Sequence, residues 1–138
     1  MANYVVGDIQ GCFEELKSGL ELINFESSKD YLWITGDLIN RGPDSLKVLE
    51  YIFKIKNSVH IVLGNHDLHY LNCFFNDGKL SDDDTFQSLM FHKKSLKLAR
   101  FLLRQPFVFS KKVLTKKKAI QVAMVHAGIP RDMSLKKA

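Results

Sequence analysis

Residues 31–43, YLWITGDLINRGP, decide the fold because they join a short apolar run to a polar loop that contains two glycines. The run 31–35 has the length and composition of a buried strand. The loop 36–43 leads into residues 46–53, where apolar side chains recur at helical spacing. The stretch therefore predicts one strand–loop–helix unit.

The same order occurs once before and once after this unit. Residues 4–6 and 60–63 are apolar runs, and each is followed by a glycine-containing loop, 7–11 and 64–67, and then by a helical period. Strands that alternate with helices are typical of βαβ units and a parallel sheet. We therefore expect an α/β fold.

The second half of the chain follows a different order. Asp84 and Gln87 have the spacing of a capping box, and Asp82–Asp84 is interpreted as a solvated helix start favoured by the helix dipole. We expect a helix over 84–103, strands at 107–109 and 119–125, and between these strands a basic turn that contains Lys111, Lys112 and Lys116–Lys118.

The composition excludes several classes of protein. With 46% hydrophobic and 25% charged residues, the chain resembles an ordinary globular domain. Cys12 and Cys73 do not suggest a disulfide scaffold. No apolar run reaches the roughly 18 residues that cross a bilayer, and residues 1–6 do not begin a signal peptide. We therefore expect a cytoplasmic protein without a membrane partner.

The net charge of +5 favours anionic partners. Lysine and phenylalanine are numerous, but they do not alternate along any one strand face. No stable nucleic-acid partner is therefore expected.

Potential metal ligands follow the expected strands. In an open parallel sheet, ligands bind at the carboxyl ends of the strands, and right-handed crossovers bring these ends to one edge. Oxygen and imidazole donors without thiolates suit a pair of Mn, Mg, Co, Fe or Zn ions with an activated water between them. The residues concerned are Asp8, Asp37, Asn65, His66, Asp67 and His126.

Four motifs, in this order, resemble those of the calcineurin-like metallophosphoesterases. They are Gly7-Asp8-x-x-Gly11, Gly36-Asp37-x-x-x-Arg41-Gly42, Gly64-Asn65-His66-Asp67 and Val125-His126-Ala127-Gly128. Further stretches, Asn40–Leu46 and Leu103–Pro106, resemble the bacterial symmetrical diadenosine tetraphosphatases within that superfamily. The resemblance implies the calcineurin-like fold, in which mixed β-sheets are flanked by helices and built from βαβ units.

The resemblance also implies ligands for two divalent metal ions. Asp8 would bind the first ion, Asp37 would bridge both, and Asn65 and His126 would bind the second. Gln10 stands where many members have histidine, and it is a further candidate ligand of the first ion.

Catalytic roles follow from the same resemblance. His66 would protonate the leaving phosphate oxygen, and Asp67 would orient His66. Arg41 would take part in catalysis by clamping a phosphate, since its planar fork matches phosphate oxygens. Asn40 and His69 are candidate substrate contacts.

The implied reaction is the symmetrical hydrolysis of diadenosine 5',5'''-P1,P4-tetraphosphate to two ADP by a metal-activated water. Dinucleoside polyphosphates are the expected substrates, with capped RNA as a related one, and the oligomeric state is not indicated. A phosphoprotein phosphatase is the nearest alternative, although that group typically has Glu at the position of Asp67 and Gly at that of Ala127. A non-catalytic nucleotide-binding remnant is the alternative if the chain ends at Ala138.

Members of the resembled family carry a later Gly-His motif whose histidine binds the second metal ion. Residues 1–138 contain no such motif after His126. We therefore expect them to be the N-terminal part of a single metallophosphoesterase domain that is incomplete at its C-terminus.

Overall fold

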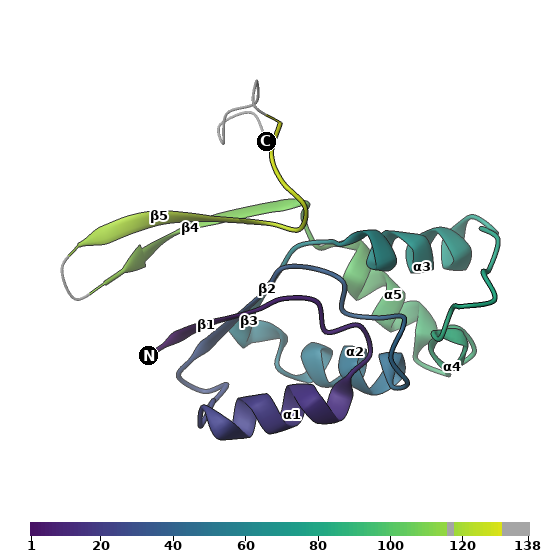
Figure 1. Ribbon diagram of the computed structural model, residues 1–138, viewed down its shortest axis with the longest axis horizontal. Helices are drawn as coiled ribbons and strands as arrows, with labels where there is room; N and C mark the ends of the chain where they lie inside the picture. Colours follow the sequence, from purple (N-terminus) through teal and green to yellow (C-terminus); the bar gives the residue numbers. More distant parts are fainter. Residues whose placement is uncertain (116–117, 131–138) are drawn as a thin grey trace.

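The computed structural model describes residues 1–115 and 118–130. Its centre is a parallel sheet of three strands in the order β1-β2-β3, with β1 at Asn3–Val6, β2 at Tyr31–Ile34 and β3 at Val59–Ile61 (Figure 1). In the register of the sheet, Val6 pairs with Ile34, which pairs with Ile61. The predicted α/β units and their parallel pairing are confirmed.

The two faces of β2 carry different neighbours because side chains alternate along a strand. Leu32 and Ile34 are buried in the main core cluster, to which the helices contribute. Trp33 points to the other face and packs with Val62 and Met124. Helices therefore cover one face of the sheet (Figure 1), and the other face holds a smaller apolar cluster.

The described residues form five α-helices and a short 3-10 helix besides the strands. The first two α-helices begin directly after the predicted glycine loops, and the third begins inside the predicted loop 64–67, so that Asn65, His66 and Asp67 form its first turn. The helices are α1 (Phe13–Leu22), α2 (Ser45–Lys54), η1 (Lys56–Ser58), α3 (Asn65–Phe75), α4 (Gln87–Met90) and α5 (Ser95–Leu103).

The prediction of one helix over 84–103 is wrong. Two helices, α4 and α5, are separated at residues 91–94. The Asp84 side chain does not cap α4 because it is buried and binds other parts of the chain, and α4 begins after Phe86 instead. The Gln87 side chain does not complete a capping box either: its amide donates to the Asp84 carbonyl over 2.6 Å, whereas a capping box needs this side chain to accept from the Asp84 backbone N–H.

The last two strands form an antiparallel hairpin of β4 (Val108–Leu114) and β5 (Ala119–Val125). Strand β5 has the predicted bounds, and among the described residues it pairs with β4, as a turn between the two strands implies. Lys111 and Lys112 lie in β4 rather than in a turn. Of the predicted basic turn, Lys116 and Lys117 lie outside the described residues.

The hairpin reaches the sheet through aromatic and apolar contacts. The Phe109 ring is 5.5 Å from the Trp33 ring and stacks on His60 at 4.4 Å between centroids. Met124 of β5 completes the cluster with Trp33 and Val62. These contacts fix the end of β5 above the sheet, where residue 126 follows.

Among the described residues, no helix has the length and apolar character needed to cross a membrane.

Candidate metal and phosphate site

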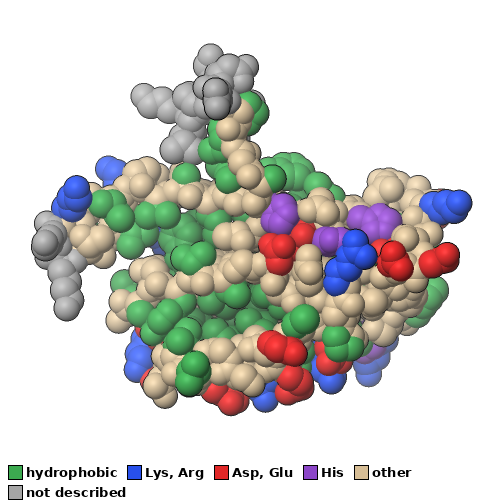
Figure 2. Space-filling view, in the orientation of Figure 1, with side chains coloured by type: hydrophobic (Ala, Val, Ile, Leu, Met, Phe, Trp, Pro, Cys, Tyr) green, Lys and Arg blue, Asp and Glu red, His purple; other side chains and the backbone are tan. Residues whose placement is uncertain are grey.

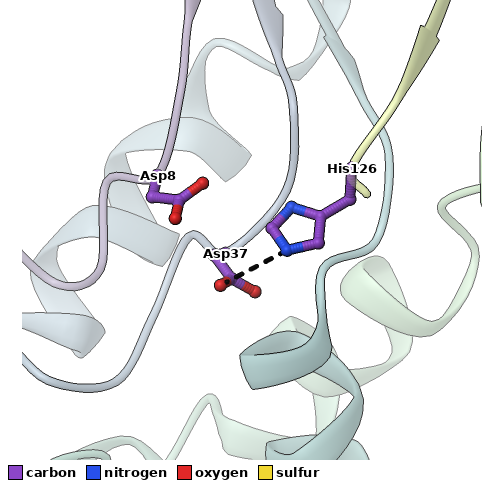
Figure 3. Close-up of side chains that lie close together, drawn as sticks. All are labelled: Asp8, Asp37 and His126. Carbon is purple, nitrogen blue, oxygen red and sulfur yellow. Dashed lines mark ion pairs between the residues drawn. The ribbon is translucent and has the colours of Figure 1, made fainter. Parts of the chain in front are cut away.

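Three loops bring Asp8, Asp37 and His126 together (Figure 3). Their ligand atoms all lie within 4.8 Å of one another, and His126 Nε2 is 3.5 Å from Asp37 Oδ2. Asp37 is buried, His126 is half-buried and Asp8 is exposed. The site therefore opens to solvent on the Asp8 side and is closed beneath Asp37.

The ring of His126 is oriented by a backbone carbonyl. Its Nδ1 is 2.8 Å from the Thr35 oxygen, an acceptor, so Nδ1 carries a hydrogen. Its Nε2 then faces Asn65 Oδ1 at 3.1 Å and Asp37 Oδ2 at 3.5 Å. Electron-rich atoms at this separation need a proton or a cation between them, so this donor set fits a divalent metal ion.

Four residues other than glycine have a positive φ in the two loops that follow β1 and β2. They are Gln10 (47°), Asp37 (51°), Asn40 (76°) and Arg41 (63°). Such backbone conformations are strained for residues with a Cβ and persist only where the surroundings hold them. Their concentration here marks these loops as the functional part of the fold.

The two loops are held together by backbone hydrogen bonds. The Gln10 amide donates to the Asp37 carbonyl over 2.8 Å, and the Gly42 amide donates to the Gln10 carbonyl over 2.7 Å. The Gln10 side chain forms no hydrogen bond within residues 1–115 and 118–130. The structure thus shows a backbone role for Gln10 and leaves its role as a metal ligand a prediction.

The Asp67 carboxylate is fully buried and binds backbone amides rather than His66. It accepts hydrogen bonds from Asp37 (2.9 Å), Leu38 (3.0 Å) and Gly64 (3.0 Å). Burial, together with the nearby charge of Asp37, raises the pKa of Asp67 to about 6. The three backbone hydrogen bonds limit this increase. The expected contact that orients His66 is absent from the described part of the chain, and Asp67 instead holds the strained loop of Asp37.

Gly64 allows the closest approach in the site. A Cβ at this position would collide with the Asp37 side chain and backbone nitrogen. The absence of a side chain lets the start of α3 pack against Asp37, whose Oδ1 accepts a hydrogen bond from the His66 amide over 2.9 Å. Glycine at 64 is thus a geometric requirement of the site.

His66 is held by Asn40. The Asn40 amide oxygen accepts hydrogen bonds from the backbone amides of Arg41 (2.9 Å) and Thr85 (3.0 Å), which fixes the orientation of the amide group. Its nitrogen therefore donates to His66 Nδ1 over 3.2 Å and to Asp84 Oδ1 over 2.8 Å. His66 Nδ1 is an acceptor in this arrangement, so in the neutral ring the proton resides on Nε2.

Asp84 supports the site through contacts that the sequence did not indicate. Its side chain, buried rather than solvated, also accepts from His69 Nε2 over 2.8 Å and from the Ser81 amide over 2.7 Å. Burial alone would raise the pKa of Asp84, but the hydrogen bonds from His69, Ser81 and Asn40 outweigh it and lower the pKa. No local signal distinguishes Asp84 from its exposed neighbours Asp82 and Asp83.

A cavity of about 220 Å³ lies beside these residues. Arg41 is exposed at its rim and forms no ion pair within the described ranges, so its guanidinium is free to meet an anion. Asn40 is only 2% exposed and supports the cavity from below rather than reaching into it. Histidine, acidic and basic side chains gather on this face (Figure 2). The lining residues are Asn40, Arg41, Asn65, His66, His69, Ser81, Asp83 and Asp84.

Comparison with known proteins gives consistent matches. A family described as calcineurin-like phosphoesterase matches residues 3–137. Two similar curated relatives, both named "Bis(5'-nucleosyl)-tetraphosphatase, symmetrical", come from Cellvibrio japonicus (44% identity) and Neisseria meningitidis (41% identity), each over all 138 residues. These alignments cover 49% and 47% of the relatives, so the chain spans about half the length of the curated relatives it matches.

Solved structures agree on the fold. A metallophosphoesterase from Sphaerobacter thermophilus aligns with a TM-score of 0.60 at 17% identity, covering 80% of this chain and 43% of the other. A hypothetical protein from Pyrococcus horikoshii OT3 aligns with a TM-score of 0.63 at 19% identity, covering 88% of this chain and 54% of the other.

Proposed function

Because the chain belongs to the calcineurin-like phosphoesterase family, we propose that residues 1–138 carry most of the active-site residues of a metal-dependent hydrolase that splits dinucleoside tetraphosphates symmetrically. For diadenosine tetraphosphate the products would be two ADP. The choice of substrate is supported by the names of the relatives, which match along the whole of this chain. The observation that carries the proposal is the convergence of Asp8, Asp37 and His126 beside His66 and Arg41.

The candidate ligands are Asp8, Asp37, His126 and Asn65, with Gln10 as a further one. Their oxygen and imidazole donors fit divalent ions such as Mn, Mg, Co, Fe or Zn, and Asp37, whose carboxylate lies near both Asp8 and His126, would suit a pair of ions. Ions bound there would supply an activated water and neutralise charge on the phosphate. The Thr35 carbonyl keeps a lone pair of His126 directed to the centre.

His66 is the proposed general acid. Asn40 occupies Nδ1, so Nε2 is the nitrogen available to the leaving phosphate oxygen. A proton delivered from Nε2 would come from the imidazolium form of the ring, because neutral imidazole is too weak an acid for this step. Arg41 is proposed to bind a phosphate group at the rim of the cavity, and Asn40 to act by positioning His66. His69 lines the same cavity, where its contact with Asp84 leaves it a candidate for contact with the substrate.

The test is hydrolysis of diadenosine tetraphosphate by the purified chain with Mn²⁺, with products separated by anion-exchange chromatography. We expect ADP as the sole nucleotide product. Formation of ATP and AMP would contradict symmetrical cleavage. Activity confined to a phosphopeptide would favour a phosphoprotein phosphatase, and nucleotide binding without turnover would favour a non-catalytic role for these residues.

A further inference from the structure

Helices α2 and α5 enclose a groove that shares no lining residue with the cavity beside His66. The groove consists of two adjoining cavities of about 580 and 530 Å³, both of which include Phe53 and Lys97 in their walls. We define it as the α2–α5 groove. We infer that this groove binds a single-stranded nucleic acid, an activity additional to the proposed hydrolysis and independent of it.

The positive charge of the chain is concentrated at this groove. Eight lysine and arginine residues line it, against one acidic residue, Glu50. The groove thus carries a formal charge of +7, whereas the remaining twelve basic and fourteen acidic residues of the chain sum to −2. A surface of this kind attracts polyanions, since each neutralised phosphate releases a counterion.

Most of these cations have no acidic partner. Lys47 pairs with Asp44 at 3.0 Å and Lys94 pairs with Glu50 at 2.7 Å. The other six form no ion pair within residues 1–115 and 118–130. They are Lys54, Lys56, Lys93, Lys97, Arg100 and Arg104. All six are exposed and therefore available to a ligand.

The cations of α5 and its ends form a continuous stripe. Lys97 and Arg100 are three residues apart in α5 and so lie on one side of the helix, and Lys93 before it and Arg104 after it line the same cavity. Like charges at this spacing destabilise a helix on their own. An anionic chain lying along the stripe would remove that repulsion.

Aromatic rings lie beneath the cations. Lys56 Nζ and Lys97 Nζ stand 4.9 and 4.8 Å from the centroid of the Phe53 ring, and Phe53 packs edge-on against Phe101 at 5.2 Å. Tyr51 and Phe13 line the adjoining cavity. Half-buried rings between cations suit unpaired bases, which can enter a groove and stack. Bases paired inside a duplex cannot enter in this way, so the groove favours a single strand.

The experiment measures fluorescence anisotropy of a labelled single-stranded oligouridylate, titrated with the full chain in EDTA so that hydrolysis does not contribute. We expect a dissociation constant at or below about 100 µM at low salt, with affinity falling as salt rises. The double variant Lys93→Glu with Lys97→Glu should weaken binding at least about tenfold. The slope of log K against log salt should become shallower by about 0.7 for each phosphate that the variant no longer neutralises.

The matched control is Lys79→Glu with Lys112→Glu, which reverses the same charge at exposed lysines outside the groove. At about 0.15 M salt, where exposed charges more than about 8 Å apart are largely screened, it should change the dissociation constant less than about twofold. Equal weakening by both double variants would overturn the inference, as would wild-type chain that fails to bind. If the charge reversals lower the melting temperature, a milder pair, Lys56→Gln with Lys97→Gln, tests the groove instead. Both of these lysines lie over the Phe53 ring.

Three competitors identify the occupant. A DNA duplex, inorganic polyphosphate and vesicles containing phosphatidylserine should each compete less well than unlabelled oligouridylate. Equal competition by polyphosphate would show that bases contribute nothing, and stronger competition by duplex or vesicles would show a different partner. Each of these results would refute the inference that the groove selects a single strand with unpaired bases. None depends on whether the chain hydrolyses diadenosine tetraphosphate.

Discussion

The buried amide of Asn40 donates a hydrogen bond to Nδ1 of His66. A carboxylate at this position would accept a hydrogen bond from the His66 ring, whereas the amide donates one and so leaves the hydrogen of the neutral ring on Nε2. The same amide nitrogen lies 2.8 Å from Asp84, so Asp84 positions His66 through Asn40 without touching it.

Replacing Asp84 by alanine should destabilise the chain by about 2 to 4 kcal/mol, since Asn40, His69 and the Ser81 amide would each lose an acceptor inside the protein. Urea denaturation at pH 7 measures this change. Asp83→Ala is the control, because Asp83 is exposed and forms no ion pair in the described part of the chain; its effect should stay within about 0.5 kcal/mol. Equal effects of the two changes would contradict the buried role of Asp84.

Asp84 should also contribute to acid denaturation. Its pKa in the folded chain is lowered, so the unfolded chain binds the proton more tightly. The resulting stability is fully present above the unfolded pKa of about 4 and is lost as the pH falls through the lower folded pKa. Urea midpoints measured from pH 7 to pH 3 should therefore converge for wild type and Asp84→Asn. A gap that widens toward low pH would refute this sign.

Substitutions at two site residues should separate chemistry from binding. We expect His66→Ala to lower turnover at least about a hundredfold, because it removes the proton donor. The Mn²⁺ affinity of this variant, measured by isothermal titration calorimetry, should stay within about threefold of wild type, since the side chain is not among the candidate ligands. Near wild-type turnover by His66→Ala would reject the proposed acid.

Asp37→Asn should lower both turnover and Mn²⁺ affinity, the latter by at least about tenfold, because it removes the central carboxylate of the cluster. Thermal unfolding with and without Mn²⁺ provides a second readout. Wild type should gain stability from the ion, and the variant should gain much less. An undiminished gain in the variant would place the ion elsewhere.

Two glycine substitutions test the close approach at the start of α3. Gly64→Ala should cost about 2 kcal/mol or more, because the new methyl group would collide with Asp37. Gly19→Ala, in α1 with no atom within 4 Å of the added Cβ, should stabilise the chain by about 1 kcal/mol. Melting temperatures of the two variants should therefore move in opposite directions, and a neutral Gly64→Ala would refute the requirement for glycine.

The parts of the fold that are local in sequence were predictable. Each parallel strand is an apolar run followed by a glycine loop and a helical period, and those signals need no partner to be recognised. Strand β5 has the same local signal, and its pairing with the neighbouring β4 is also local, but how the hairpin rests on the parallel sheet depends on contacts between distant segments. The break at residues 91–94 separates two helices that each pack against α2, and helical periodicity does not reveal it.

The candidate site was likewise predictable only in part. Asp8, Asp37 and His126 converge as predicted, because the loops that bear them lie at the same edge. Asp67 and Asn40 act on groups other than those expected, since buried polar side chains bind whichever backbone groups the fold leaves unpaired. The spacing of the basic residues around α5 is visible in the sequence, but their position beside the rings of α2 depends on how the two helices pack together.

His126 directly follows β5, and the hairpin rests on the sheet through Trp33, Val62 and Met124. Asp8 and Asp37 therefore belong to loops of the parallel sheet and His126 to the end of the hairpin, so the site lies across the junction of the two. The distance from His126 to the two carboxylates depends on how three apolar side chains pack together. Residues that do not touch the site thus set its geometry.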